Sequence, residues 1–142
     1  MDALIQFFSE EVVFSMPDEP RVHDWIIRTI TDEKLEAGVI NIIFCNDDYL
    51  LDLNQKFLDR DTLTDVIAFD YREEGNEVSG DVFISIERIR DNASKLKQSL
   101  DHELNRVIIH GILHLCGYAD KTPGQKAAMT AKEDKYLSLL LL

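Results

Sequence analysis

The most informative stretch of this chain reads Glu103-Leu-Asn-Arg-Val-Ile-Ile-His-Gly-Ile-Leu-His-Leu-Cys116. Its apolar run is typical of a helix, and His110 and His114 stand four residues apart within it. Side chains at this spacing leave one face of a helix about a turn apart, so the two imidazoles can share one ion. Gly117 can then end the helix in the left-handed conformation. Such a turn would bring Asp120 back toward the histidine pair.

His110, His114 and Asp120 form a candidate set of metal ligands. Three protein ligands with a fourth position for water are the arrangement of catalytic zinc, whereas structural zinc is usually enclosed by four ligands rich in Cys. In the competing interpretation both histidines are ordinary core side chains, which this spacing produces more often than it produces a metal site. The glycine turn and the carboxylate that follows it favour the metal. The pattern therefore predicts one Zn²⁺ per chain.

The rest of the chain alternates between strand and helix patterns. Branched and aromatic runs predict strands at 5–14, 39–45, 65–71 and 80–86. Apolar residues at three- and four-residue spacing predict helices at 21–36, 46–57, 87–97, 100–116 and 123–141. Pro17 and Pro20 are expected to break the chain before the first helix, and Gly38 to end that helix.

No linker rich in Pro, Gly or Ser divides the chain. The expected fold is α/β (α+β), a single domain over residues 1–142. In it a mixed sheet of about four strands packs with about five helices, and the metal-ligand helix lies near the C-terminus.

Composition predicts the solubility and the cellular compartment of the protein. Its 142 residues are 45% hydrophobic and 30% charged, as in soluble globular chains. Apolar runs fall short of the roughly 20 residues of a membrane helix. The N-terminus lacks the basic region of a signal peptide. We therefore expect a soluble, cytoplasmic protein.

Charge and cysteine usage add two further constraints. A formal net charge of −12 argues against broad electrostatic attraction to nucleic acid, although a metal dication would supply positive charge that this count ignores. Cys45 and Cys116 have no CxxC spacing, which predicts reduced, buried thiols.

Residues 110–120 read His-Gly-Ile-Leu-His-Leu-Cys-Gly-Tyr-Ala-Asp. This stretch resembles the motif of the YbeY endoribonucleases, His-Gly-x-Leu-His-Leu-x-Gly-Tyr-Asp-His, at every specified position through Tyr118. It departs at the end, where Ala119 replaces Asp and Asp120 replaces the third His. An aspartate is a competent zinc ligand, but its negative charge makes the site less positive than three imidazoles would.

The resemblance extends over most of the chain. Three further segments look like the family's LN, TDVLSF and GDI segments, in the same order: 46–54, 63–69 and 80–85. The family usually carries an Arg directly after the aromatic that follows LN, where this chain has Leu58 after Phe57. Because that arginine has a role in RNA cleavage, its role here is vacant or has moved. Arg60 is the nearest cation, and a solvated loop charge is the alternative interpretation.

The resemblance implies a metal-dependent hydrolase, namely a zinc-dependent, single-strand-specific endoribonuclease. Its implied roles are maturation of the 3′ end of 16S rRNA and ribosome quality control. Its implied partners are single-stranded RNA or rRNA and the ribosome or small-subunit proteins, with no membrane. His110, Arg106 and Arg60 are the candidate catalytic residues. Arg106 lies one turn before His110, where it can hold a phosphate or form a helix-surface ion pair.

Several other side chains have both a functional and a structural interpretation. Thr64, Asp65 and Asn54 can support the site by hydrogen bonding, as partners of ligating histidines do, or can cap turns. Four aromatic residues can stack on unpaired bases, or lie in the core: Phe57, Phe69, Tyr71 and Tyr118.

Three other functions compete with RNA cleavage. A zincin-like peptidase would need the Glu of HExxH as its base, and Gly111 occupies that place. A non-catalytic, ribosome-associated assembly factor would use the metal structurally. Two His and one carboxylate also form the triad of non-haem iron oxygenases, but that triad usually sits on a β-barrel, for which this chain has too few strands.

Overall fold

Strands are interleaved with helices up to residue 85, and helices follow. The computed structural model describes residues 3–73 and 75–140. Its elements are β1 (Leu4–Ser9), α1 (Glu19–Asp32), β2 (Glu36–Cys45), α2 (Asp47–Leu58), β3 (Val66–Asp70), β4 (Glu77–Ser85), α3 (Ile86–Leu96), α4 (Leu100–Leu115) and α5 (Pro123–Leu140). Four strands in one sheet and five helices within these ranges confirm the predicted α+β fold. The predicted end of the last helix at 141 lies outside the described residues.

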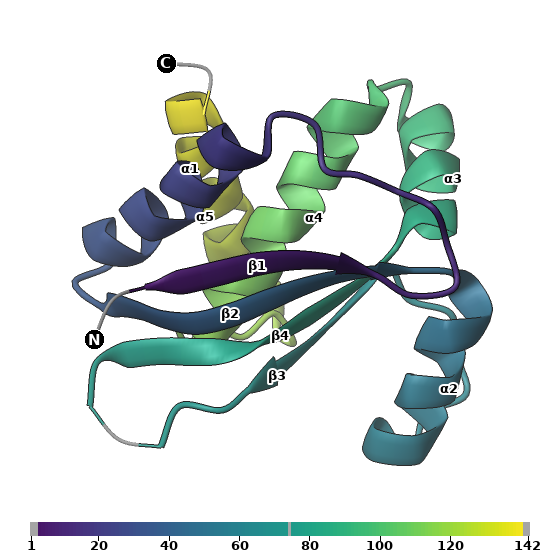
Figure 1. Cartoon of the computed structure of the whole chain (residues 1–142), viewed down its shortest axis with the longest axis horizontal. Helices are drawn as coiled ribbons and strands as arrows, with labels where there is room; N and C mark the ends of the chain where they lie inside the picture. Colours follow the sequence, from purple (N-terminus) through teal and green to yellow (C-terminus); the bar gives the residue numbers. More distant parts are fainter. Residues whose placement is uncertain (1–2, 74, 141–142) are drawn as a thin grey trace.

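The sheet is mixed, with strand order β1-β2-β4-β3. β1, β2 and β4 run parallel, and β3 pairs antiparallel with β4 at the edge. Figure 1 shows α1, α3, α4 and α5 on one side of the sheet and α2 on the other. The large apolar core lies on the four-helix side, and a smaller cluster of Cys45, Leu50 and Ile67 lies on the α2 side. The sheet therefore separates two unequal cores.

The α4 helix packs against β3, β4, α3 and α5, so most of its surface is covered. Gly111 lies where this helix crosses β4. A Cβ added there would stand 2.6 Å from Cγ1 of Val82 and 3.5 Å from Cγ2 of Val66. Because Val82 is itself fully buried, the helix can approach the sheet this closely only with glycine. Position 111 consequently faces the sheet.

The boundaries of the first helix differ from the predicted ones. It begins at Glu19 and ends at Asp32, and Pro20 lies in its first turn, where a missing N–H is tolerated. Lys34 takes a positive φ of 65° and ends the helix early. Gly38 lies inside β2, at a register shift, where a Cβ would come 2.4 Å from Oγ of Ser79. The prediction that Gly38 ends the helix was therefore wrong, because the glycine serves a bulge.

The first strand also ends earlier than predicted. β1 stops at Ser9, and Glu11 follows with φ of 63°. Phe14 still packs edge-on against Phe44, with ring centroids 4.8 Å apart. The apolar and aromatic residues up to Phe14 are therefore explained by packing against the core, because strand pairing ends at Ser9.

Both cysteines are free thiols, as predicted, but only Cys45 is fully buried, whereas Cys116 is partly buried. Burial raises the pKa of each thiol to about 12, so both stay protonated. None of the helices in the described part of the chain is long and apolar enough to cross a membrane.

Replacing Gly111 with Ala tests the close approach of α4 to the sheet. In an exposed helix this change stabilises by about 1 kcal/mol. Here the clash with Val82 outweighs that gain, and we expect the free energy of unfolding to fall by about 1–2 kcal/mol in urea denaturation. Gly124→Ala is the matched control, because a Cβ there meets nothing within 4 Å. Equal stability of the two variants would contradict the packing role of Gly111.

Candidate metal centre

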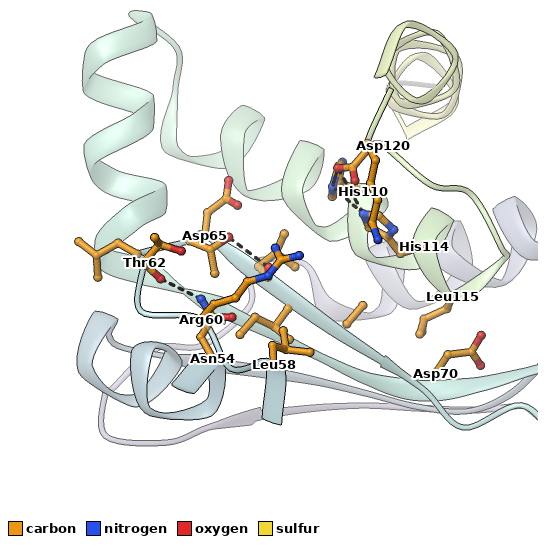
Figure 2. A pocket seen from close by; sticks show the side chains of 16 residues that line it. Asn54, Leu58, Arg60, Thr62, Asp65, Asp70, His110, His114, Leu115 and Asp120 are labelled. Carbon is orange, nitrogen blue, oxygen red and sulfur yellow. Dashed lines mark hydrogen bonds and ion pairs between the residues drawn. The ribbon is translucent and has the colours of Figure 1, made fainter. Parts of the chain in front are cut away.

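Local backbone geometry brings Asp120 to the histidine pair. His110 and His114 project from α4, and Asp120 lies in the loop that joins α4 to α5 (Figure 2). Gly117 has φ of 109°, and its N–H donates to the carbonyl of His114 at 3.0 Å. The N–H of Tyr118 donates to the carbonyl of Leu113, also at 3.0 Å. This is the left-handed reversal predicted at Gly117, and it returns the chain to the helix face.

Three donor atoms from these side chains form a small triangle. Nε2 of His110 lies 3.1 Å from Nε2 of His114, and Oδ2 of Asp120 lies 3.2 Å and 3.5 Å from these two nitrogens. A tetrahedral zinc ion with bonds of about 2.0–2.1 Å separates its ligand atoms by roughly 3.3 Å. The triangle fits such an ion closely. The structure thus brings together the three predicted ligands and leaves one side open to the cleft.

The two histidines have opposite electrostatic environments. Burial opposes the charged form of His110, but the hydrogen bond and charge of Glu133, together with Asp120, outweigh it and raise its pKa. Burial and the neighbouring His110 lower the pKa of His114. His114 is therefore neutral at physiological pH, the form that a metal requires.

Glu133 is a site residue that the sequence interpretation missed. Its Oε2 lies 2.6 Å from Nδ1 of His110, and only 7% of the residue is exposed. Ligating histidines usually have such a carboxylate or carbonyl on their second nitrogen. One signal was available: the buried positions of α5 are Met129, Glu133, Tyr136 and Leu140, so an acid stands on the apolar face of a helix.

Arg106 is occupied by ion pairs. Its guanidinium donates to Oε1 of Glu133 at 2.8 Å and to Oδ1 of Asp134 at 2.7 Å. Of the two interpretations of Arg106, the structure favours the ion pair over the phosphate ligand. The ion pair joins α4 to α5 and does not lie along the surface of α4 alone. Two carboxylates offset its charge, which leaves less of it to attract a phosphate.

Arg60 lies across a cleft from the donor triangle. The cleft has a volume of about 620 Å³, and its lining includes Leu58, Arg60, Asp65, His110, His114, Asp120 and Lys121. Figure 2 shows Leu58 and Arg60 on the α2 side, with the Arg60 side chain extending into the space between them and the histidines. The sequence neighbours Leu58 and Arg60 thus line the same cleft, and Arg60 supplies a cation there.

The contacts of Asn54, Thr64 and Asp65 show which of these polar candidates cap turns. Nδ2 of Asn54 donates to the carbonyl of Thr62 at 2.9 Å, and Oγ1 of Thr64 donates to the carbonyl of Val66 at 3.4 Å. Both contacts match the turn-capping interpretation. Oδ2 of Asp65 accepts from Nδ2 of Asn92 at 3.4 Å, and burial raises the pKa of this carboxyl group although the charge of His110 lowers it.

Of the four aromatic candidates, two are held by contacts within the protein and two are largely exposed. Phe69 packs on Phe83 with ring centroids 5.8 Å apart, and the hydroxyl of Tyr118 donates to Glu33. Phe57 and Tyr71 are 64% and 58% exposed, so their rings remain accessible to a ligand.

Two histidines and one carboxylate, grouped at the wall of a cleft in an α+β fold, are typical of metal-dependent enzymes. The family model for endoribonuclease YbeY matches residues 9–140. The chain belongs to this family, as the motif resemblance implied.

Individual relatives agree with the family assignment. The endoribonuclease YbeY of Flavobacterium psychrophilum is 48% identical over 93% of this chain and 94% of its own length. That of Phocaeicola vulgatus is 45% identical over 98% of this chain and 100% of its own length. The solution structure of TM1509 from Thermotoga maritima superposes with a TM-score of 0.67 at 26% identity, covering 96% of this chain and 89% of that one.

Substitutions of Asp120 test whether it completes the donor set. Asp120→Ala removes one of three ligands, so we expect zinc affinity to fall by more than the roughly 10- to 100-fold that loss of an outer hydrogen-bond partner costs. Asp120→His should retain zinc, because an imidazole can occupy the same corner. Competition with a chromogenic chelator measures both. Asp70 lines the same cleft outside the triangle, and Asp70→Ala is the control. Wild-type zinc affinity in Asp120→Ala would remove Asp120 from the site.

Proposed function

We propose that this protein is a zinc-dependent endoribonuclease that cleaves single-stranded RNA, acting in 16S rRNA 3′-end maturation and ribosome quality control. One observation supports the activity most strongly: in a member of the endoribonuclease YbeY family, three donor atoms with zinc-like spacing meet at the wall of an open cleft. The cleft volume of about 620 Å³ lies in the usual range for small-ligand sites, so it is large enough for part of an RNA strand.

In this proposal the side chains of the cleft have two roles, metal binding and phosphate binding. His110, His114 and Asp120 would hold the ion. When bound, zinc activates water for attack and offsets charge that develops on a phosphoryl group. Arg60, across the cleft, binds the phosphate and orients it toward the donor triangle, a role open to a guanidinium because its planar N–H groups match phosphate oxygens. Arg60 would thereby take over the role of the arginine that Leu58 replaces.

Local charge makes an RNA substrate compatible with an acidic protein. The chain has a formal net charge of −12, so long-range attraction to RNA is weak. Arg60 and Lys121 line the cleft, and a zinc dication adds positive charge beside them. Binding would consequently depend on contacts inside the cleft.

A peptidase is a poorer fit to the same site. The place of the general base in HExxH belongs to Gly111, and that position faces Val82 in the core. A glutamate introduced there would meet the sheet and not the cleft. The cleft carboxylates in the described part of the chain are Asp65, Asp70 and Asp120.

The finer assignments follow from the family role. A protein that matures rRNA would work where ribosomes assemble, so we infer a cytoplasmic protein with the ribosome or small-subunit proteins as partners. The alternative is a non-catalytic assembly factor with a structural metal, motivated by Leu58 in place of the family arginine. It requires tight zinc binding without RNA turnover.

Zinc-loaded protein should cleave a single-stranded RNA oligonucleotide and leave casein intact. His114→Ala should lose both zinc and cleavage, since only two ligands remain. His102, an exposed histidine at the start of α4, supplies the control His102→Ala, which should keep both. Gel analysis of end-labelled RNA, with metal content measured on the same samples, checks the outcome. Full zinc occupancy without cleavage would favour the assembly factor.

Arg60→Ala should lower kcat/KM for RNA by roughly 10-fold or more, the usual worth of a hydrogen bond to a charged group, while zinc content stays unchanged. Arg90 is an exposed arginine of α3, so Arg90→Ala controls for the loss of one positive charge. Steady-state kinetics on a short fluorogenic RNA separates the two variants. If both lose the same small factor, Arg60 acts only through net charge.

A further inference from the structure

Glu133 is bonded on both of its carboxylate oxygens. Oε2 is 2.6 Å from Nδ1 of His110, and Oε1 accepts from Arg106 at 2.8 Å. Arg106 and His110 lie one helical turn apart on α4, and Glu133 comes from α5. The carboxylate therefore lies between two side chains of the helix that carries the metal ligands, and its rotation is restricted from both sides.

We propose that Glu133, held by Arg106, is the positioning residue that sets the tautomer and ring orientation of His110, an inference that rests on the proposed metal site. A carboxylate accepts from Nδ1 only when that nitrogen carries the proton. In the neutral ring, the form that a metal requires, Nε2 of His110 then keeps its lone pair, and this atom lies 3.1 Å from Nε2 of His114 and 3.2 Å from Oδ2 of Asp120. The hydrogen bond thus presents the correct nitrogen to the ion.

Burial explains why Arg106 is part of this arrangement. The side chain of Glu133 is 9% exposed, and an ionised carboxylate in such a place needs a partner charge. Arg106 supplies that charge and holds Oε1 of Glu133 at 2.8 Å, which keeps Oε2 turned toward Nδ1 of His110. Arg106 therefore acts on the metal site through Glu133.

Two neighbouring acids allow the role of Glu133 to be separated from general charge effects. Asp134 is adjacent to Glu133 in the sequence and bonds to the same guanidinium, but its side chain is 60% exposed. Its contact with Arg106 is consequently worth little. Asp134 also has no contact with His110. A change at Asp134 removes one carboxylate from α5 and leaves the hydrogen bond to Nδ1 in place.

The test compares Glu133→Met, Glu133→Gln and Asp134→Asn in the full chain. Methionine fills the buried space without an acceptor, so zinc affinity should fall roughly 10- to 100-fold, the range seen when such partners of ligating histidines are removed. Glutamine keeps one acceptor oxygen and should recover part of that loss. Asp134→Asn should bind zinc like the wild type. Chelator competition measures the affinities.

Nitrogen-15 NMR of the imidazoles supplies a second readout that does not depend on activity or on the folding of any variant. In zinc-loaded wild-type protein, His110 should carry its proton on Nδ1 and the metal on Nε2. Coordination through Nδ1 in the wild type would overturn the proposal, and so would wild-type zinc affinity in Glu133→Met. If the wild-type protein itself binds no zinc, the metal site proposed above fails, a result distinct from these two.

Discussion

The close approach of α4 to the sheet is the constraint on which the site depends. Gly111 lets the helix settle against Val82 at a distance that no side chain would permit. Position 111 thereby faces the sheet, while His110 and His114 face the cleft. A helix held on several sides by packed elements cannot rotate to relieve a misplaced ligand, so the histidine spacing is fixed by packing on the opposite face. The positions of the two histidines in the cleft therefore depend on the packing of Gly111 against Val82 in the core.

The second constraint is electrostatic. A chain with net charge −12 places buried carboxylates beside its candidate metal ligands, where desolvation makes each unpaired charge costly. Glu133 is balanced by Arg106 and by His110, and the surplus acid Asp134 lies outside, mostly in solvent. The described lining of the cleft has two cations, Arg60 and Lys121, and three carboxylates, Asp65, Asp70 and Asp120, so the positive charge available to RNA there depends on the proposed ion.

Two departures from the family motif meet in this cleft. Asp120 occupies the place of the third histidine and still closes the triangle, because the loop after Gly117 brings its shorter side chain within 3.2 Å of His110. Leu58 occupies the place of the family arginine, and Arg60 reaches the cleft from two residues further on. In the proposed function, Asp120 and Arg60 supply the ligand and the cation that the family motif places at other residues.

The sequence alone determined the elements, the helical histidine pair and the reversal at Gly117, because these depend on local periodicity and on the left-handed freedom of glycine. Its predictions at Pro20 and Gly38 were wrong because proline is also accepted in the first turn of a helix and glycine in a β-bulge, not only where an element ends. Only the tertiary structure decided that Glu133 contacts His110, that Arg106 is occupied by α5 and that Gly111 faces the sheet. Such contacts join segments more than 20 residues apart, and no local rule fixes how two helices meet.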